Sequence, residues 1–285
     1  MIKSIFITAF KRNKIFFTTL RKLTKCKNYD QFKKLIIYQD INQNILNKIK
    51  KIDSEIEVIN TNYTKNTSGI HKCNSNTYIG FKKCFEDYKS EYVIFLEDDI
   101  LPAYDFLEFH DNLILHYRHD EKFFAVNSFS KEYIKYNKNS DFEYSKFIFG
   151  IGKGWSVPKE KWKTLKQMWK ELFYSKINEF YDCFFEYKIK FKYYVIMPYR
   201  SRVYDQPSNG LNASFALERK SQFNKSWKKS FLKQKRYETK NYIFNSKMNY
   251  SWRNDCLHYS KFNILRTKYI FYSNKVKTII KNIIY

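Results

Sequence analysis

The sequence contains little glycine or proline, and its few cysteines are scattered. Its 285 residues include 6 Gly, 4 Pro and 5 Cys, with no Cys-x-x-Cys pair. An odd, dispersed set of cysteines is typical of reduced thiols and not of a disulfide framework or a zinc site. No apolar stretch approaches the ~20 residues that span a bilayer, and no cleavage site of a signal peptide follows the first residues. We therefore expect a cytoplasmic globular protein.

The sequence is also short of acidic residues. It has 28 Asp and Glu against 53 Lys and Arg, which gives a formal net charge of +25. The excess is uneven, because residues 218–285 carry 17 basic and 3 acidic residues, a net of +14. A field of this sign attracts nucleic acids, anionic lipid surfaces and phosphorylated substrates. We expect residues 218–285 to form a basic, aromatic and partly helical C-terminal extension.

Apolar runs alternate with segments of helical spacing. The runs predict strands at 4–9, 35–38, 56–59 and 92–96, and the segments between them predict helices at 12–25, 41–52 and 75–88. Beyond these we expect helices at 105–119, 158–172 (with Pro158 in its first turn) and 177–190, and strands at 123–127 and 193–197. Strands that alternate with helices favour an α/β fold, with a mostly parallel central sheet flanked by helices.

Carboxylates follow two of the predicted strands. The apolar run at 92–96 ends in Glu97, Asp98 and Asp99, and the run at 35–38 leads to Asp40. In open α/β sheets, ligands bind at the carboxyl ends of the strands. Three adjacent carboxylates repel one another unless a cation or a hydrogen-bond network holds them. A ligand site is one interpretation; the other is that Asp99 or Asp105 only begins a turn or caps the next helix.

Several motifs of the chain follow one another in a recognisable order. They are 6–9 (Phe-Ile-Thr-Ala), 37–40 (Ile-Tyr-Gln-Asp), 93–100 (Val-Ile-Phe-Leu-Glu-Asp-Asp-Ile), 102–109 (Pro-Ala-Tyr-Asp-Phe-Leu-Glu-Phe), 149–155 (Phe-Gly-Ile-Gly-Lys-Gly-Trp), 180–182 (Phe-Tyr-Asp) and 201–203 (Ser-Arg-Val). In this order they resemble nucleotide-sugar glycosyltransferases of the GT-A fold, in particular N-acetylglucosaminyltransferase I and its bacterial relatives. The resemblance covers roughly residues 3–215.

The resemblance implies a division of the chain and a role for each matching acid. Residues 1–217 would form a GT-A-like domain, with a nucleotide-sugar half at 1–105 and an acceptor half at 106–217. Its implied site residues are Asp99 for a divalent metal (Mn²⁺ or Mg²⁺), Glu97 and Asp98 for the donor sugar and ribose, Asp40 for the base of the nucleotide, and Asp182 as the general base. The chain departs from the family at Asp182, where a single acid lies between Tyr181 and Cys183 in place of two adjacent acids after a Trp.

The residues themselves allow two interpretations at several of these positions. Arg12 follows the first strand and would meet a diphosphate, or would be an exposed charge. Trp155 follows a glycine-bearing loop and would stack on a sugar ring, or would belong to the core. Asp182 lies in an apolar segment that would raise its pKa toward that of a useful base, or it is an exposed or capping residue. His110, His116 and His119 favour a solvated helix face over a metal site.

The resemblance therefore implies a metal-dependent, inverting glycosyltransferase. It would move a sugar from a nucleotide-diphosphate sugar, with a UDP-sugar favoured, to a glycan or lipid-linked glycan precursor of the cell surface. The basic extension would dock on the anionic inner face of the cell membrane, or would be a solvated part of the fold. The competing class is a basic nucleic-acid-binding protein, or a metal-dependent nuclease or nucleotidyltransferase. We expect no nucleic-acid partner, because acids at the site would repel phosphates without a metal.

Overall fold

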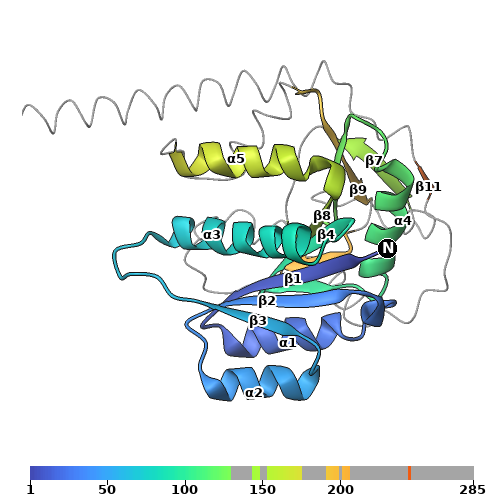
Figure 1. The fold of residues 1–285 in the computed structure, drawn as a ribbon. Helices are drawn as coiled ribbons and strands as arrows, with labels where there is room; N and C mark the ends of the chain where they lie inside the picture. Colours follow the sequence, from blue (N-terminus) through green and yellow to red (C-terminus); the bar gives the residue numbers. More distant parts are fainter. Residues whose placement is uncertain (130–142, 148–152, 175–190, 199–200, 206–242, 245–285) are drawn as a thin grey trace, which may run out of the picture. The chain divides into compact units, whose positions relative to one another are not determined.

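The structure is a computed structural model. It describes residues 1–129, 143–147, 153–174, 191–198, 201–205 and 243–244 (Figure 1). The first half of the chain alternates strands and helices as the sequence predicts. Its elements are β1 (Lys3–Phe10), α1 (Asn13–Leu23), β2 (Lys33–Gln39), α2 (Gln43–Ile52), β3 (Glu57–Thr61), α3 (Gly69–Lys82) and β4 (Tyr92–Glu97). β1 pairs in parallel with both β2 and β4, and β2 pairs in parallel with β3. The predicted parallel sheet is therefore confirmed for these four strands.

The second half extends the same sheet and reverses the direction of some strands. Its elements are β5 (Ile100–Pro102), α4 (Phe106–Tyr117), β6 (Phe123–Asn127), β7 (Glu143–Phe147), β8 (Trp155–Pro158), α5 (Trp162–Tyr174), β9 (Tyr194–Pro198), β10 (Val203–Asp205) and β11 (Ile243–Phe244). The nine-stranded sheet has the order β11-β7-β9-β6-β8-β4-β1-β2-β3, and β5 pairs with β10 in a separate two-stranded sheet. β8 runs antiparallel between β4 and β6, and β9 pairs in parallel with β6. The sheet is therefore mostly parallel, with antiparallel strands inserted after β4.

Two predicted helix starts differ from the structure. Pro158 is the last residue of β8, and a short 3-10 turn (Lys159–Lys161) precedes α5. The predicted role of Pro158 in the first helical turn is therefore wrong. α3 begins at Gly69, earlier than predicted, because the Ser68 side chain accepts a hydrogen bond from the His71 backbone N–H at 3.2 Å and caps the helix.

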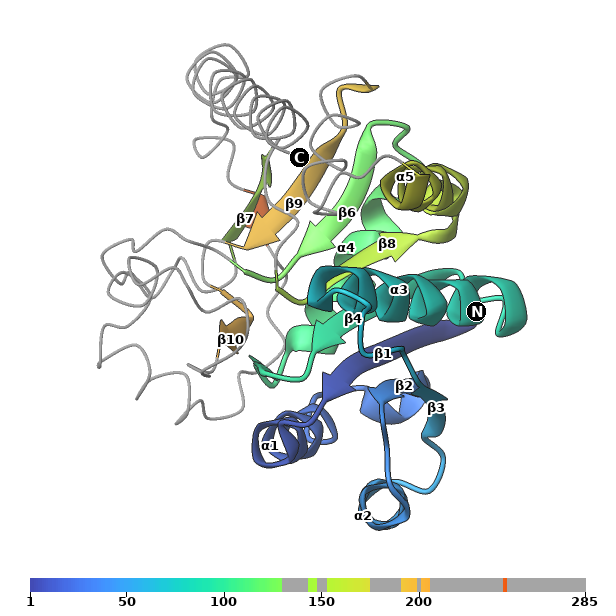
Figure 2. The same ribbon diagram turned by 90° about the vertical axis from the view of Figure 1, so that its left-hand side faces the viewer.

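Helices cover both faces of the sheet. Successive residues of β1 point to opposite faces, so Ile5 and Ile7 belong to one core cluster and Phe6 to the other. The first cluster joins α1, α2 and α4, and the second joins α3 and α5, in agreement with the two views (Figures 1 and 2). All five residues from Tyr92 to Leu96 are buried, as expected of a strand covered on both faces. The α/β architecture with a helix layer on each face is confirmed.

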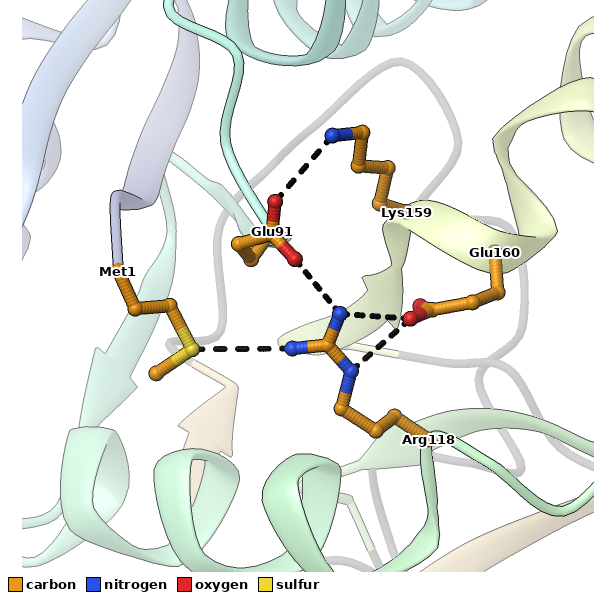
Figure 3. Close-up of polar contacts among 5 residues, drawn as sticks. All are labelled: Met1, Glu91, Arg118, Lys159 and Glu160. Atoms are coloured by element: carbon orange, nitrogen blue, oxygen red, sulfur yellow. Dashed lines mark hydrogen bonds and ion pairs between the residues drawn. The ribbon is translucent and has the colours of Figure 1, made fainter.

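A network of ion pairs lies at the amino end of β4 (Figure 3). Arg118 Nη2 lies 2.6 Å from Glu91 Oε2 and 2.6 Å from Glu160 Oε1, and Lys159 Nζ lies 3.2 Å from Glu91 Oε1. Arg118 also donates to the sulfur of Met1 at 3.7 Å. The network ties β4 to the end of α4 and to the turn before α5. It lies at the end of β4 away from the three adjacent acids.

Some of the sequence-based predictions fall on residues that the structure does not describe. The helix at 177–190, Asp182 and almost all of the basic extension at 218–285 lie outside the described residues. The predicted domain boundaries stay predictions. Within the part of the chain that the structure describes, no helix has the length and apolarity needed to cross a bilayer.

Candidate active site

The carboxyl ends of β1 and β4 lie side by side and bring two short polar segments together. In the parallel pair, Thr8 of β1 stands opposite Glu97 of β4. The residues that follow the two strands, Arg12 on one side and Asp98 and Asp99 on the other, therefore meet at the same edge of the sheet. Ligands bind at this edge in open α/β sheets. The structure thus brings Arg12 together with the two acids that follow β4.

The guanidinium of Arg12 bridges the two aspartates. Its Nη1 lies 2.7 Å from Asp99 Oδ2, and its Nη2 donates a hydrogen bond to Asp98 Oδ1. Asp98 is the more buried, with 4% of its side chain exposed against 16% for Asp99. The Phe10 backbone N–H donates to Asp98 Oδ2 at 3.3 Å, and Thr19 Oγ1 donates to the Asp98 carbonyl at 2.8 Å. Asp98 is therefore held inside the turn by the end of β1 and by α1, and its predicted contact with the donor stays a prediction.

Burial and mutual repulsion change the protonation of these acids. Burial, followed by the charge of Asp99, raises the pKa of Glu97 to about 7, although Lys153 opposes the shift. Burial raises the pKa of Asp98 to about 6 against the opposing effect of Arg12. Burial lowers the pKa of Arg12, but the charges of Asp99 and Asp98 outweigh it and raise that pKa. Arg12 therefore stays charged, whereas Glu97 exchanges a proton near neutral pH, as groups in active sites often do.

Asp40 lies on the rim of the same edge, after β2. Its backbone is in the left-handed region with a φ of 55°, and its N–H donates to the Thr61 carbonyl of β3 at 3.0 Å. Gln39 Nε2 donates to Asp40 Oδ2 at 3.2 Å, and the side chain is exposed. Lys11, after β1, has a φ of 56°. Non-glycine residues adopt such values rarely and at a cost on the order of 1 kcal/mol or more, so both strand ends have unusual backbone geometry.

Two residues near the acids were missed by the sequence analysis. Burial of the thiol, followed by the charges of Glu97 and Asp98, raises the pKa of Cys73 in α3. The Tyr38 hydroxyl donates to Asn13 Oδ1, and burial followed by Asp98 raises the pKa of Tyr38 to about 12. A lone cysteine and a strand tyrosine have no distinctive spacing. Only the pairing of the strands and the position of α3 bring them to this edge.

The donor atoms at this edge fit a divalent cation only in part. Among the described residues, no three His, Cys, Asp or Glu side chains are grouped so that they could hold a metal ion. Mg²⁺ and similar hard cations are, however, often held by one or two carboxylates together with the phosphates of a substrate. Asp99, the more exposed of the two aspartates, is the residue that would hold such a cation here. The residues therefore fit a cation shared with a diphosphate, and not one held by these side chains alone.

Trp155 does not fit its predicted role on a sugar ring. It begins β8 and is 1% exposed, and its ring packs 4.9 Å from the ring centroid of Phe81 and 6.0 Å from that of Phe95. The interpretation as a core tryptophan is the one that the structure supports. The preceding Gly154 has a φ of 66°, and a Cβ there would come within 2.9 Å of Val203 Cγ1. That glycine is therefore required by packing.

Two other candidates serve the interior of the protein. His110 is fully buried, and both of its ring nitrogens form hydrogen bonds of 2.6 Å, Nδ1 with Ser156 Oγ and Nε2 with Ser128 Oγ. Burial lowers the pKa of His110 to about 3. It is therefore neutral and structural, whereas a solvated face was expected for it. Asp105 stands at the N-cap of α4 but makes no capping hydrogen bond with its side chain. Its carboxylate instead accepts a hydrogen bond from Arg202 Nε at 2.9 Å.

Comparison with known proteins finds similarity at the level of structure. No family model matches the sequence, and no curated protein matches it. Among solved structures, TarS of S. aureus (residues 1–349) matches with a TM-score of 0.51 at 14% identity, over 72% of this chain and 60% of that chain. Its complex with UDP-GlcNAc matches with a TM-score of 0.50 at 14% identity, over 76% of this chain and 61% of that chain. Its complex with UDP matches with a TM-score of 0.51 at 14% identity, over 73% of this chain and 61% of that chain.

The match is one of fold. The chain spans about three fifths of the length of the TarS structures, and the identity is low. The resemblance to glycosyltransferases of the GT-A fold, which the order of the motifs indicated, is therefore confirmed at the level of the fold.

Proposed function

We propose that the chain is a nucleotide-sugar glycosyltransferase whose donor diphosphate binds at the carboxyl edge of β1 and β4. The observation that carries the proposal is the meeting of Arg12, Asp98 and Asp99 at this edge. TarS, a protein of the same fold, has been solved with UDP-GlcNAc and with UDP. A UDP-sugar is accordingly the donor that we favour.

The charges at this edge explain why a divalent cation would be needed. One guanidinium faces two aspartates, and Glu97 adds further negative charge when it is ionised. A diphosphate that approached this cluster alone would be repelled. A cation such as Mn²⁺ or Mg²⁺, held by Asp99, would supply the charge that stabilises the leaving diphosphate. Arg12, whose guanidinium pairs with both aspartates, would orient a phosphate oxygen.

The remaining roles follow from position along the edge. Asp40, exposed at the end of β2, would contact the nucleoside of the donor. Glu97 would contact the donor sugar, and its raised pKa would let it donate a hydrogen bond near neutral pH. Asp182 remains our candidate for the general base of an inverting transfer. The acceptor that we propose is a glycan or lipid-linked glycan, with residues 218–285 docked on an anionic membrane surface from the cytoplasm.

Thermal melting with Mn²⁺ and UDP tests the proposal. A ligand present at 100 times its dissociation constant stabilises the folded state by about 2.7 kcal/mol. We expect wild type to melt at a higher temperature with Mn²⁺ plus UDP, and Asp99→Asn to lose this gain. Glu91→Gln is the matched control, because it changes an acid at the opposite end of β4 (Figure 3) and should keep the gain. No stabilisation of wild type by any nucleoside diphosphate with Mn²⁺ would refute the proposal.

The general base is tested separately. Asp182→Asn should bind UDP and Mn²⁺ as wild type does and should lose transfer to acceptor. Retained transfer would remove Asp182 from the mechanism.

The strongly basic segment at 218–285 favours one alternative, a metal-dependent nuclease or nucleotidyltransferase. The same acids and cation would serve that chemistry. An oligonucleotide added in the melting assay distinguishes the two. Stabilisation by the oligonucleotide with Mn²⁺, without stabilisation by UDP, would favour the alternative.

A further inference from the structure

The cation that the proposed function requires and the guanidinium of Arg12 need the same carboxylate. Arg12 Nη1 lies 2.7 Å from Asp99 Oδ2, so Asp99 is already neutralised by a side chain of the protein. A carboxylate oxygen paired at this distance with a guanidinium is a poor ligand for a second positive charge, because the two cations would repel each other.

We propose that Arg12 is an exchangeable counter-ion: it holds Asp99 when no divalent cation is bound and releases Asp99 when the cation arrives with the diphosphate. This inference rests on the proposed function and assigns Arg12 a second task in the same site. Arg12 would thereby prevent tight binding of the cation alone and would move its charge to the diphosphate when both are present.

The two ends of the Arg12 bridge differ in a way that favours release from Asp99. The Asp98 end is fixed, because that side chain is 4% exposed and also accepts a hydrogen bond from the Phe10 backbone. The Asp99 end is looser, with 16% of the Asp99 side chain and 34% of the Arg12 side chain exposed. A guanidinium that keeps its contact with Asp98 can turn its other nitrogen away from Asp99. Asp98 is then the anchor and Asp99 the exchanged partner.

The backbone at Arg12 supports a movement confined to the side chain. The Arg12 N–H donates to the Phe10 carbonyl at 2.7 Å, and the Arg12 carbonyl accepts from the Phe16 N–H at 2.9 Å, which anchors the residue at the start of α1. Turning the side chain therefore leaves the helix and β1 in place. Arginine suits the task because its planar guanidinium binds carboxylates and phosphates with the same fork of donors.

The experiment compares the binding of Mn²⁺ alone with the binding of UDP at saturating Mn²⁺. The variants are wild type, Arg12→Gln and Arg12→Lys of the full chain, with free Mn²⁺ measured by electron paramagnetic resonance and UDP binding by calorimetry. Arg12→Gln should bind Mn²⁺ alone about 10-fold more tightly than wild type, because the competing charge is gone, and UDP about 10-fold more weakly. Opposite changes for the two ligands are not expected from a merely structural defect.

A matched control is available at the other end of the sheet. Arg118 also bridges two carboxylates, those of Glu91 and Glu160 (Figure 3), far along β4 from the proposed site. Arg118→Gln should leave both affinities within about 2-fold of wild type. In the Asp99→Asn background, Arg12→Gln should give no gain in Mn²⁺ affinity, because the contested carboxylate is absent.

Three results would overturn the inference. One is an unchanged or weaker Mn²⁺ affinity in Arg12→Gln, and another is a gain that persists in the Asp99→Asn background. If Arg12→Gln does not fold, Arg12→Lys is measured instead. Its ammonium pairs with one aspartate only and leaves Asp99 to the cation, so Mn²⁺ affinity should rise. The third overturning result is an unchanged Mn²⁺ affinity in Arg12→Lys. Failure of wild type to bind UDP would refute the proposed function and is read from a different titration.

Discussion

The buried ion pair between Asp105 and Arg202 allows a test of how much a buried charge pair contributes to the stability of the fold. Arg202 Nε lies 2.9 Å from Asp105 Oδ2, and 3% and 7% of the two side chains are exposed. The Arg202 backbone N–H donates to the Ser128 carbonyl, and the Arg202 carbonyl accepts from the Ala103 N–H, both at 2.8 Å. The pair therefore connects the turn before α4 to the strand β10 and to the end of β6.

Removal of one partner should cost much more than removal of both. Arg202→Met leaves the Asp105 carboxylate buried without its guanidinium, and breaking a buried pair in this way costs about 3–5 kcal/mol of the free energy of unfolding. The double variant Asp105→Leu/Arg202→Met has no unpaired charge, and replacement of a buried pair by apolar groups is often close to neutral. We expect the double variant to recover at least about 2 kcal/mol relative to Arg202→Met.

Urea unfolding followed by circular dichroism at pH 7.5 measures these free energies. The control is Lys159→Met, which breaks the pair with Glu91, whose two side chains are 50% and 29% exposed. An exposed pair contributes about 0–1 kcal/mol, so this variant should unfold nearly as wild type does. The reasoning is refuted if Arg202→Met loses less than about 1 kcal/mol, or if the double variant is at least as unstable as Arg202→Met.

Three further predictions concern other residues of the described part. The pKa of His110 is about 3 in the folded protein and about 6.5 in the unfolded chain. As the pH falls below about 6.5, the unfolded state therefore takes up a proton that the folded state does not bind. This group should lower the free energy of unfolding of wild type by about 2 kcal/mol at pH 5, and His110→Gln should not show the loss. Gly80→Ala should destabilise the protein by about 1–3 kcal/mol, because the new Cβ would lie 2.3 Å from Phe6 Cε2. The alkylation of Cys73 should have its pH midpoint above that of a free thiol, and Glu97→Gln should lower it, because the Glu97 charge is the largest electrostatic cause of the raised pKa.

Each of these has its own control. For His110, unfolding free energies of wild type and variant are compared at pH 7.5 and pH 5, and equal losses in both would contradict the assignment. For Gly80, the control is Gly69→Ala in the exposed first turn of the same helix α3, which should be neutral or stabilising; a neutral Gly80→Ala would show that the helix does not approach Phe6 so closely. For Cys73, mass spectrometry of the labelled peptide gives the midpoint, and an equal shift in Glu91→Gln would exclude an effect specific to Glu97.

Several elements of the fold and site could be predicted from local sequence. The run from Tyr92 to Leu96 is apolar at every position because β4 is covered on both faces, and a short run of this kind is read directly from the chain. The placement of Glu97 to Asp99 and of Asp40 after two strands follows once those strands are recognised. Since parallel neighbours place their carboxyl ends at one edge, the sequence determined that these acids would converge.

Other features depend on pairings that no local pattern contains. Arg12 meets Asp99 across 87 residues of sequence, and Arg202 meets Asp105 across 97. Trp155 lies in the core because β8 inserts antiparallel between β4 and β6, a strand order that the spacing of motifs did not reveal. The sequence by itself therefore determined the kinds of element and which acids reach the edge. The tertiary structure decided which side chain each acid meets, because partners distant in the chain are chosen by strand order and packing.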